Sequence, residues 1–160
     1  MQSVKNNNLS SLSIVIPVYN SENCVQELLK KLEESLVLFD YEIILVDDKS
    51  IDKSWDILTH NFKNKANVSI IKLSKNFGQD SAIMCGLHNA RKDYIVIMDD
   101  DLQHDPKYIP ELYDEIKKTK KDVCFANFLT KNQTLIKNFG SWLNDRLANI
   151  VIKKPRNMYL

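Results

Sequence analysis

Apolar residues along the chain fall into two alternating patterns, short continuous runs and longer segments with helical spacing. The continuous runs are typical of strands that are covered on both faces of a sheet. They lie at residues 12–18, 41–48, 68–74, 93–100 and 122–128. The segments between them favour helices, most clearly where apolar residues recur every three or four positions. These segments lie at residues 21–39, 54–64, 79–91, 106–118 and 134–154.

This alternation predicts an α/β domain with a mostly parallel sheet and helices on both faces. Ser21 is the expected N-cap of the first helix, and Pro106 is expected in the first turn of the fourth. Ligands of such sheets bind at the carboxyl ends of the strands, near a topological switch point. The polar clusters of this chain follow its predicted strands, as PVYN, VDDKS, SKNFGQ and DDDLQHD. The pattern therefore indicates a binding site at that edge.

Composition narrows the class of protein. The chain has 160 residues, 44% of them hydrophobic, and a net charge of +1, which allows a real core and gives no reason to expect nucleic-acid binding. Three cysteines at irregular spacing match neither a disulfide framework nor a zinc motif and favour a reducing, cytoplasmic environment. Residues 1–11 are polar and are predicted to be a disordered lead-in. Hydrolase, P-loop and dinucleotide-binding motifs are absent from the sequence.

A run of acidic residues, Asp99–Asp101, follows the fourth apolar run. In an extended backbone Asp99 and Asp101 point to the same side, where their carboxylates repel unless a cation or a proton lies between them. Mg²⁺ or Mn²⁺, held by these carboxylates and by the phosphates of a substrate, would meet that need, and Gln103 offers a further oxygen. The alternative is an acidic helix N-terminus, which accounts for Asp105 better than for Asp99 and Asp101.

Three other positions remain open between a binding and a structural role. At the end of the second predicted strand, where Asp47 and Asp48 stand, a single carboxylate can accept hydrogen bonds from a nucleobase or ribose, or can be a turn aspartate. Tyr19 can stack on a base or be a half-buried core residue. Gly78, which precedes a helix, is weak evidence for phosphate binding and more often marks a turn.

Taken in order, four stretches of the chain resemble the family 2 glycosyltransferases, which have the Rossmann-like GT-A fold. They are SIVIPVYNSE, YEIILVDDKSIDKSWDIL, LSKNFGQDSAIMCGLHNARKDYIVIMDDDLQHDPKYIPEL and DVCFANF. The NFGQDSA and DLQHDPKYIPEL segments are similar to the branch that moves a sugar from a nucleotide to a polyprenyl phosphate, dolichyl or undecaprenyl. The resemblance implies a metal-dependent, inverting enzyme that uses a UDP- or GDP-linked sugar and works at the cytoplasmic face of a membrane.

The resemblance also implies roles for single residues. The outer aspartates of the Asp-x-Asp element, Asp99 and Asp101, would be catalytic and would hold Mg²⁺ or Mn²⁺ together with Gln103. Lys137 and Ser141 would meet the acceptor phosphate. The residues that bind the donor would be Pro17, Tyr19, Val46, Asp48 and Asp100.

Two positions depart from the branch. Phe128 stands where a phosphate-binding arginine is usual, and Ser21 stands where a glutamate is usual, with Glu22 one residue later. Unless Lys131 or Arg146 supplies the missing charge, Phe128 favours an alternative: a family 2 transferase that extends a cell-surface polysaccharide on a sugar hydroxyl. A further alternative is a non-catalytic module that binds nucleotide sugars. The chain also ends earlier than family members do, so we expect a C-terminally truncated fragment.

The domain organisation follows from these patterns. Residues 12–133 are predicted to be the catalytic domain that binds the nucleotide sugar, and residues 134–160 an amphipathic helix that leads into a missing C-terminal region. Apolar residues of that helix, such as Phe139 and Trp142, lie beside basic ones such as Lys137 and Arg146. A helix of this kind can lie in a bilayer interface, which suggests membrane association, or its apolar side can pack on the sheet.

Overall fold

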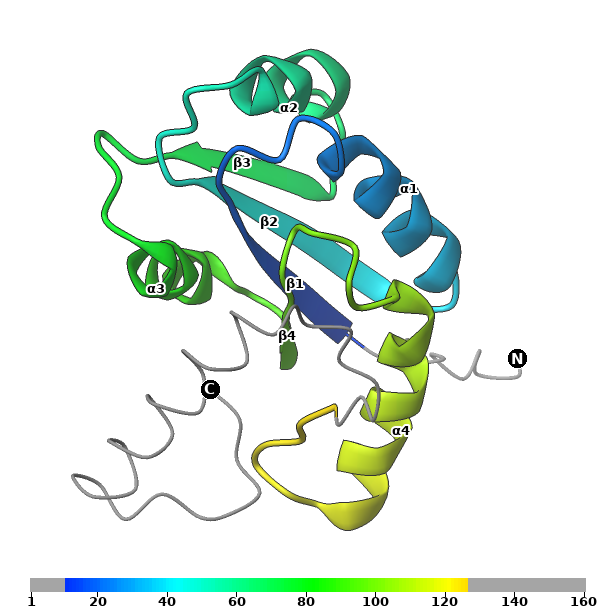
Figure 1. Cartoon of the computed structure of the whole chain (residues 1–160). Coiled ribbons are helices and arrows are strands. Elements are labelled where there is room, and N and C mark those ends of the chain that lie inside the picture. Colours follow the sequence, from blue (N-terminus) through cyan, green and yellow to red (C-terminus); the bar gives the residue numbers. More distant parts are fainter. Residues whose placement is uncertain (1–10, 127–160) are drawn as a thin grey trace, which may run out of the picture. The chain divides into compact units, whose positions relative to one another are not determined.

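A parallel sheet forms the centre of the folded unit that ends at Cys124, in a computed structural model that describes residues 11–126 (Figure 1). Its strands are β1 (Ser11–Val18), β2 (Asp40–Asp47), β3 (Val68–Lys72) and β4 (Tyr94–Ile97). Their spatial order is β3-β2-β1-β4, so the chain builds outward from β1 to β3 and then crosses to the other side of β1. That crossing places a topological switch point between β1 and β4, where open α/β sheets bind ligands.

Helices cover both faces of the sheet, as the alternating pattern predicts (Figure 1). They are α1 (Val25–Ser35), α2 (Ser54–Phe62), α3 (Gln79–Asn89), the 3₁₀ turn η1 (Pro106–Tyr108) and α4 (Ile109–Thr119). Apolar residues of α1, α2 and α4 share one core with one face of β1, and η1 contacts α1, whereas α3 packs on the opposite face. The predicted α/β class with a parallel sheet is confirmed.

Strand β1 supplies both cores, which explains its continuous apolar run. Ile14 and Ile16 are fully buried on the side of α1, and Val15 is fully buried on the side of α3. Helix α3 approaches β1 closely at Gly86, where an added Cβ would lie 2.3 Å from Cγ1 of Val15. The small residues of α3 therefore set the distance between this helix and the sheet.

The ends of two helices test the predicted caps. Pro106 begins η1 as expected, and the Asp105 side chain caps that turn by accepting a hydrogen bond from the Lys107 amide at 3.1 Å. The prediction for Ser21 is wrong, because α1 begins only at Val25 and its N-cap position is Cys24. The Ser21 side chain does not cap α1 because it is engaged elsewhere, at the carboxyl edge of the sheet.

The fourth and fifth predicted strands differ from the structure. Strand β4 ends at Ile97 rather than at residue 100, and residues 122–126 are not in a strand. The remaining two residues of the predicted fifth strand lie outside the described residues. Helix α4 ends where Lys120 takes a left-handed conformation with φ of 52°, and the chain beyond it pairs with no strand among residues 121–126. Ile97, on the α3 side of the edge strand β4, is 50% exposed.

Two predicted segments fall on residues that the structure does not describe. The lead-in predicted for residues 1–11 lies outside the described part except for Ser11, which begins β1. The amphipathic helix predicted for residues 134–160, with Lys137 and Ser141, lies wholly outside it, as do Phe128, Lys131 and Arg146.

Candidate functional site

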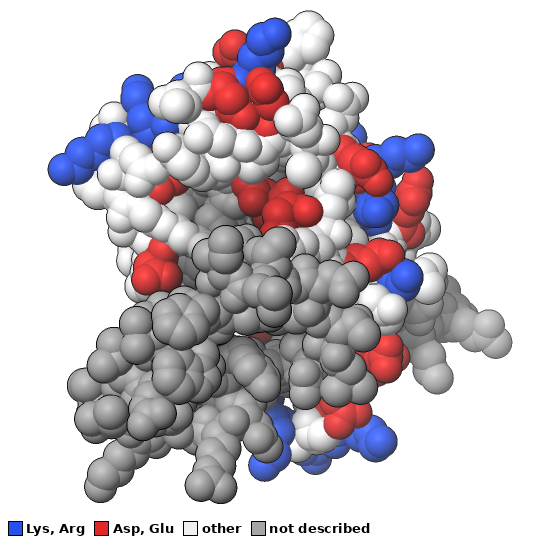
Figure 2. Space-filling model, in the orientation of Figure 1, with Lys and Arg blue, Asp and Glu red and all other residues white. Residues whose placement is uncertain are grey.

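Four loops meet at the carboxyl edge of the sheet, because all four strands run in the same direction. They are the β1–α1 loop (19–24), the β2–α2 loop (48–53), the β3–α3 loop (73–78) and the β4–η1 loop (98–105). On the face shown in Figure 2, one group of acidic side chains lies near the middle, and other acidic side chains lie toward the margins beside basic ones. Side-chain hydrogen bonds connect each loop to its neighbours, and these bonds define the geometry of the site.

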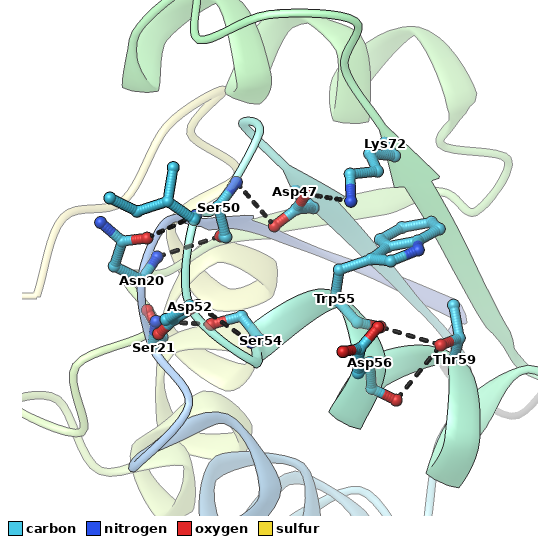
Figure 3. Close-up of polar contacts among 11 residues, drawn as sticks. Asn20, Ser21, Asp47, Ser50, Asp52, Ser54, Trp55, Asp56, Thr59 and Lys72 are labelled. Atoms are coloured by element: carbon cyan, nitrogen blue, oxygen red, sulfur yellow. Dashed lines mark hydrogen bonds and ion pairs between the residues drawn. The ribbon is translucent and has the colours of Figure 1, made fainter.

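The β1–α1 and β2–α2 loops are joined by reciprocal hydrogen bonds (Figure 3). The Asn20 amide donates to Oγ of Ser50 at 3.0 Å, and the Asn20 side-chain oxygen accepts from the Ile51 amide at 2.9 Å. The Ser21 amide donates to Oγ of Ser54 at 2.7 Å in a buried position. Asn20 has φ of 55°, a left-handed conformation that asparagine tolerates better than most residues. The two loops therefore hold each other in one conformation.

Glu22 and Asp52 extend this connection. The Glu22 amide donates to Oδ2 of Asp52 at 3.1 Å, and Oε2 of Glu22 accepts from the Lys53 amide at 3.0 Å. Burial alone would raise the pKa of Asp52, but hydrogen bonds from Ser54 and from the Glu22 amide lower it below its ordinary value. Glu22 is thus committed to the β2–α2 loop and does not take the place of the glutamate that Ser21 replaces.

Asp100 ties the β1–α1 loop to the β4–η1 loop. Its Oδ2 accepts a hydrogen bond from the Tyr19 amide at 3.1 Å and a second from the Ser21 hydroxyl. Burial raises the pKa of the Asp100 carboxyl; the bonds from Ser21 and Tyr19 oppose this rise, and the nearby charge of Asp101 adds to it. The middle aspartate therefore faces the protein, and the Ser21 hydroxyl has its partner here.

The outer aspartates have different surroundings. Oδ1 of Asp99 accepts a hydrogen bond of 2.8 Å from Nε2 of Gln79, the first residue of α3. Asp101 is exposed, and its Oδ1 accepts from the Gln103 amide at 3.0 Å. Because β4 ends at Ile97, strand periodicity does not extend through the triplet, and the two carboxylates are positioned by their loop contacts instead.

The donor set for a metal ion at this edge is partial. No group of three histidine, cysteine, aspartate or glutamate side chains within residues 11–126 converges as a ready-made metal site. Asp99 and Asp101 nonetheless present hard oxygen atoms, and within the same residues no lysine or arginine forms an ion pair with either. Mg²⁺ is commonly held by one or two carboxylates, with substrate phosphates and water completing its shell. These residues fit that arrangement.

Asp48 is buried and holds the β3–α3 loop. It is 3% exposed, and its two oxygens accept hydrogen bonds of 2.8 Å from the amides of Phe77 and Gly78. Gly78 has φ of 90°, a conformation that L side chains rarely adopt, and α3 begins at the next residue. Asp48 therefore fixes the turn from which α3 starts.

The other residues expected to bind the donor differ in exposure. Pro17 and Val46 are neighbours in the β1–β2 register, and both are buried. The Val46 side chain belongs to the core on the α3 side of the sheet, so only its main chain faces the edge. Tyr19 is 46% exposed at the start of the β1–α1 loop. Of the side chains predicted to bind the nucleoside, Tyr19 is thus the one available for stacking.

Gln79 was not singled out from the sequence, and Asp47 was considered only together with Asp48. Gln79 contacts Asp99, and its position directly after a glycine at a helix start was the available signal. Asp47 is fully buried; its Oδ1 accepts from the Ser50 amide at 3.3 Å, and its Oδ2 has no hydrogen-bond partner among the described residues. Nζ of Lys72 lies 4.0 Å from that oxygen and 4.6 Å from the centroid of the Trp55 ring (Figure 3).

Fold and edge loops together define an α/β domain of the kind that binds ligands at a switch point. The chain belongs to the glycosyl transferase family 2, whose model matches residues 13–158. No helix among residues 11–126 is both long enough and apolar enough to cross a membrane.

Curated relatives agree with this family. A dolichol-phosphate mannosyltransferase of Pyrococcus furiosus is 38% identical over 106 residues, which cover 66% of this chain and 30% of that protein. An undecaprenyl-phosphate 4-deoxy-4-formamido-L-arabinose transferase of Proteus mirabilis is 35% identical over 153 residues, which cover 86% of this chain and 47% of that protein. The chain thus spans less than half the length of either relative.

Solved structures share the fold. S. aureus TarS 1–349, in complex with UDP, superposes with a TM-score of 0.59 at 24% identity, over 79% of this chain and 39% of that one. The mannosyltransferase PcManGT of Pyrobaculum calidifontis, in complex with GDP-Man and Mn²⁺, superposes with a TM-score of 0.51 at 19% identity, over 57% of this chain and 28% of that one. The fold is that of the GT-A glycosyltransferases, as the sequence resemblance implied.

Proposed function

We propose that this chain is the catalytic domain of a metal-dependent, inverting glycosyltransferase that moves a sugar from a nucleotide to a polyprenyl phosphate at the cytoplasmic face of a membrane. One observation carries the proposal: Asp99 and Asp101 lie at the carboxyl edge of the sheet and, among the described residues, neither forms an ion pair with a lysine or arginine. Two relatives named for transfer to dolichol phosphate and undecaprenyl phosphate support the choice of acceptor.

The donor nucleoside is proposed to lie over the ends of β1 and β2. Tyr19 is exposed there and can stack on the base, with Pro17 and the main chain of Val46 beneath it. Each Asp48 oxygen already accepts one amide hydrogen bond, and a carboxylate oxygen can accept another, so Asp48 can still receive a base N–H. A UDP- or GDP-linked sugar fits these requirements equally.

Asp99 and Asp101, with Gln103 as a further oxygen ligand, are proposed to hold a divalent metal ion on the diphosphate of the donor. Mg²⁺ or Mn²⁺ bound there would offset the negative charge that develops on the departing nucleotide. Asp100 contributes indirectly, because its hydrogen bonds from Tyr19 and Ser21 hold the acidic loop against the β1–α1 loop. The protein thus supplies positioning and charge, which are the main needs of this reaction.

The acceptor phosphate is proposed to meet Lys137 and Ser141. A phosphate oxygen is already ionised near neutral pH, so it can attack the anomeric carbon without a general base. The bond from that carbon to the donor phosphate breaks as the new bond forms on the opposite face, and the nucleoside diphosphate leaves. We therefore expect inversion. A product that keeps the anomeric configuration of the donor, as read by NMR, would contradict this step.

The decisive experiment measures whether binding of the nucleotide sugar depends on the metal and on Asp101. Calorimetry with UDP- and GDP-sugars, with and without Mn²⁺, is expected to show binding that depends on the metal and is lost in Asp101→Ala. Asp114→Ala, which removes an exposed carboxylate on α4, is the matched control. Donor binding that neither Mn²⁺ nor Asp101→Ala changes would count against the proposal.

A second candidate shares the fold and the donor. Phe128, in place of the arginine usual in the polyprenyl-phosphate branch, favours a transferase that extends a cell-surface polysaccharide on a sugar hydroxyl. That reaction requires a general base, whereas attack by a phosphate does not. Product analysis with undecaprenyl phosphate and with an oligosaccharide acceptor, each at the same donor concentration, distinguishes the two.

A further inference from the structure

Gln79 and Asp99 form a contact that the proposed reaction does not by itself explain. Nε2 of Gln79 donates to Oδ1 of Asp99 at 2.8 Å, although the two residues are 20 positions apart and Gln79 begins α3 whereas Asp99 lies in the β4–η1 loop. Gln79 is the first residue of α3 and is exposed, so this bond does not serve the core. Its effect is to set the direction of the Asp99 carboxylate.

We propose that Gln79 is a positioning residue that orients the Asp99 carboxylate to hold a divalent cation. The inference rests on the proposed function, because it assumes that Asp99 is a ligand of the metal. Oδ1 of Asp99 already accepts a hydrogen bond from the side-chain amide of Gln79, so Oδ2 is the oxygen with both lone pairs available to the ion. Hydrogen-bonded partners of ligating carboxylates contribute to metal affinity, and their loss commonly weakens it by about 10-fold to 100-fold.

The chemical type of the residue matters. A neutral amide fixes the orientation of the carboxylate and leaves its negative charge intact. A lysine or arginine in the same place would also donate a hydrogen bond, but its charge would offset that of Asp99 and repel a divalent cation. Glutamine therefore both orients the Asp99 carboxylate and leaves its negative charge in full. A hydrophobic residue of similar length would leave the charge but would not orient the carboxylate.

The position of Gln79 is fixed by Asp48, through the β3–α3 loop. Asp48 accepts hydrogen bonds from Phe77 and Gly78, and Gly78 leads directly into the helix that begins with Gln79. A chain of contacts thus runs from Asp48 through the β3–α3 loop to Asp99. We expect the orientation of Asp99 to depend on this loop.

The test measures Mn²⁺ binding by electron paramagnetic resonance, first with Mn²⁺ alone and then with Mn²⁺ and UDP. Gln79→Met keeps the length of the side chain and removes the N–H group that donates a hydrogen bond to Asp99. We therefore expect about a 10-fold weaker Mn²⁺ affinity. Gln79→Lys is expected to bind more weakly still, because it adds a positive charge beside Asp99. Gln26→Met, in the exposed first turn of α1, is the matched control and is expected to bind like the wild type.

The outcomes separate this inference from the proposed function. If Gln79→Met binds Mn²⁺ like the wild type while Asp101→Ala loses binding, the role of Gln79 is overturned and the metal site stands. If Gln79→Met and Gln79→Lys lose affinity equally and both lower the midpoint of thermal unfolding, Gln79 is a structural residue only. If the wild type binds no Mn²⁺ with or without UDP, the proposed metal dependence fails and the inference falls with it.

Discussion

The carboxylate of Asp48 holds Gly78 in a left-handed conformation directly before α3, with 2.8 Å between Oδ2 and the Gly78 amide nitrogen. The two residues are 30 positions apart, and the bond joins the end of β2 to the start of a helix that packs on β1 and β2. Asp48, which is expected to accept a hydrogen bond from a nucleobase, therefore also fixes the backbone conformation of the β3–α3 loop. Any substitution at Asp48 will therefore change both the binding of the sugar donor and the conformation of this loop.

Asp48→Asn is expected to lower the free energy of unfolding by about 1–2 kcal/mol. The amide side chain can accept from only one of the two main-chain N–H groups, and its own NH₂ then faces the other. Urea unfolding at neutral pH measures the change. Asp93→Asn, which alters an exposed carboxylate before β4, is the control and is expected to change little. Equal stability of Asp48→Asn and the wild type would show that the two amides do not need the carboxylate.

Gly86→Ala is expected to destabilise the fold by about 1–3 kcal/mol, because its added methyl overlaps Cγ1 of Val15 in a packed core. The effect should shrink in a Val15→Ala background, where the clashing methyl groups are gone. Urea unfolding of both single variants and of the double variant measures this coupling. Met84→Ala, on the exposed side of α3, is the control. Strict additivity of the two core substitutions would argue against the close approach of α3 to β1.

The stability that Asp52 provides is expected to depend on pH. Its pKa is lower in the folded protein than its ordinary value, because hydrogen bonds from Ser54 and Glu22 outweigh the effect of burial. The folded state therefore favours the ionised form, and this contribution is present above the unfolded value of 3.8 and is lost as the pH falls through the folded pKa.

Urea unfolding of the wild type and of Asp52→Asn, at neutral pH and at successively lower pH, tests this linkage. The advantage of the wild type should be greatest at neutral pH and should decrease below about pH 4. Asp114→Asn, in α4, serves as the control for a general effect of removing one carboxylate. A difference between wild type and Asp52→Asn that stays constant down to the lowest pH would contradict the linkage.

The segment 134–160 is predicted to bring the chain to an anionic membrane. Flotation with liposomes that contain anionic lipids should recover the chain in the lipid fraction, and Trp142→Glu together with Lys153→Glu should reduce that recovery several-fold. Neutral liposomes provide the control for the electrostatic part. Absence of the chain from the lipid fraction would favour packing of this segment on the protein instead.

The sequence by itself determined the order of the elements and the edge at which the polar residues collect. Apolar spacing is a local property, so β1, α1, β2 and α2 could be predicted within a few residues of their observed bounds, and the Asp105–Pro106 pair predicted the start of η1. The spacing also predicted a fifth strand at residues 122–128, but residues 122–126 are not in a strand. A strand requires a partner strand, and local spacing does not supply one.

Only the tertiary structure decided which polar side chains meet at that edge. The Ser21 side chain caps no helix because its hydroxyl donates a hydrogen bond to Asp100, 79 residues away. Asp99 is oriented by Gln79 rather than by strand periodicity. The strand order β3-β2-β1-β4 determines these hydrogen-bond partners, because it brings loops that are distant in the sequence together. A buried or half-buried polar group must find a hydrogen bond wherever the fold places it, and that place is not encoded in the neighbouring residues.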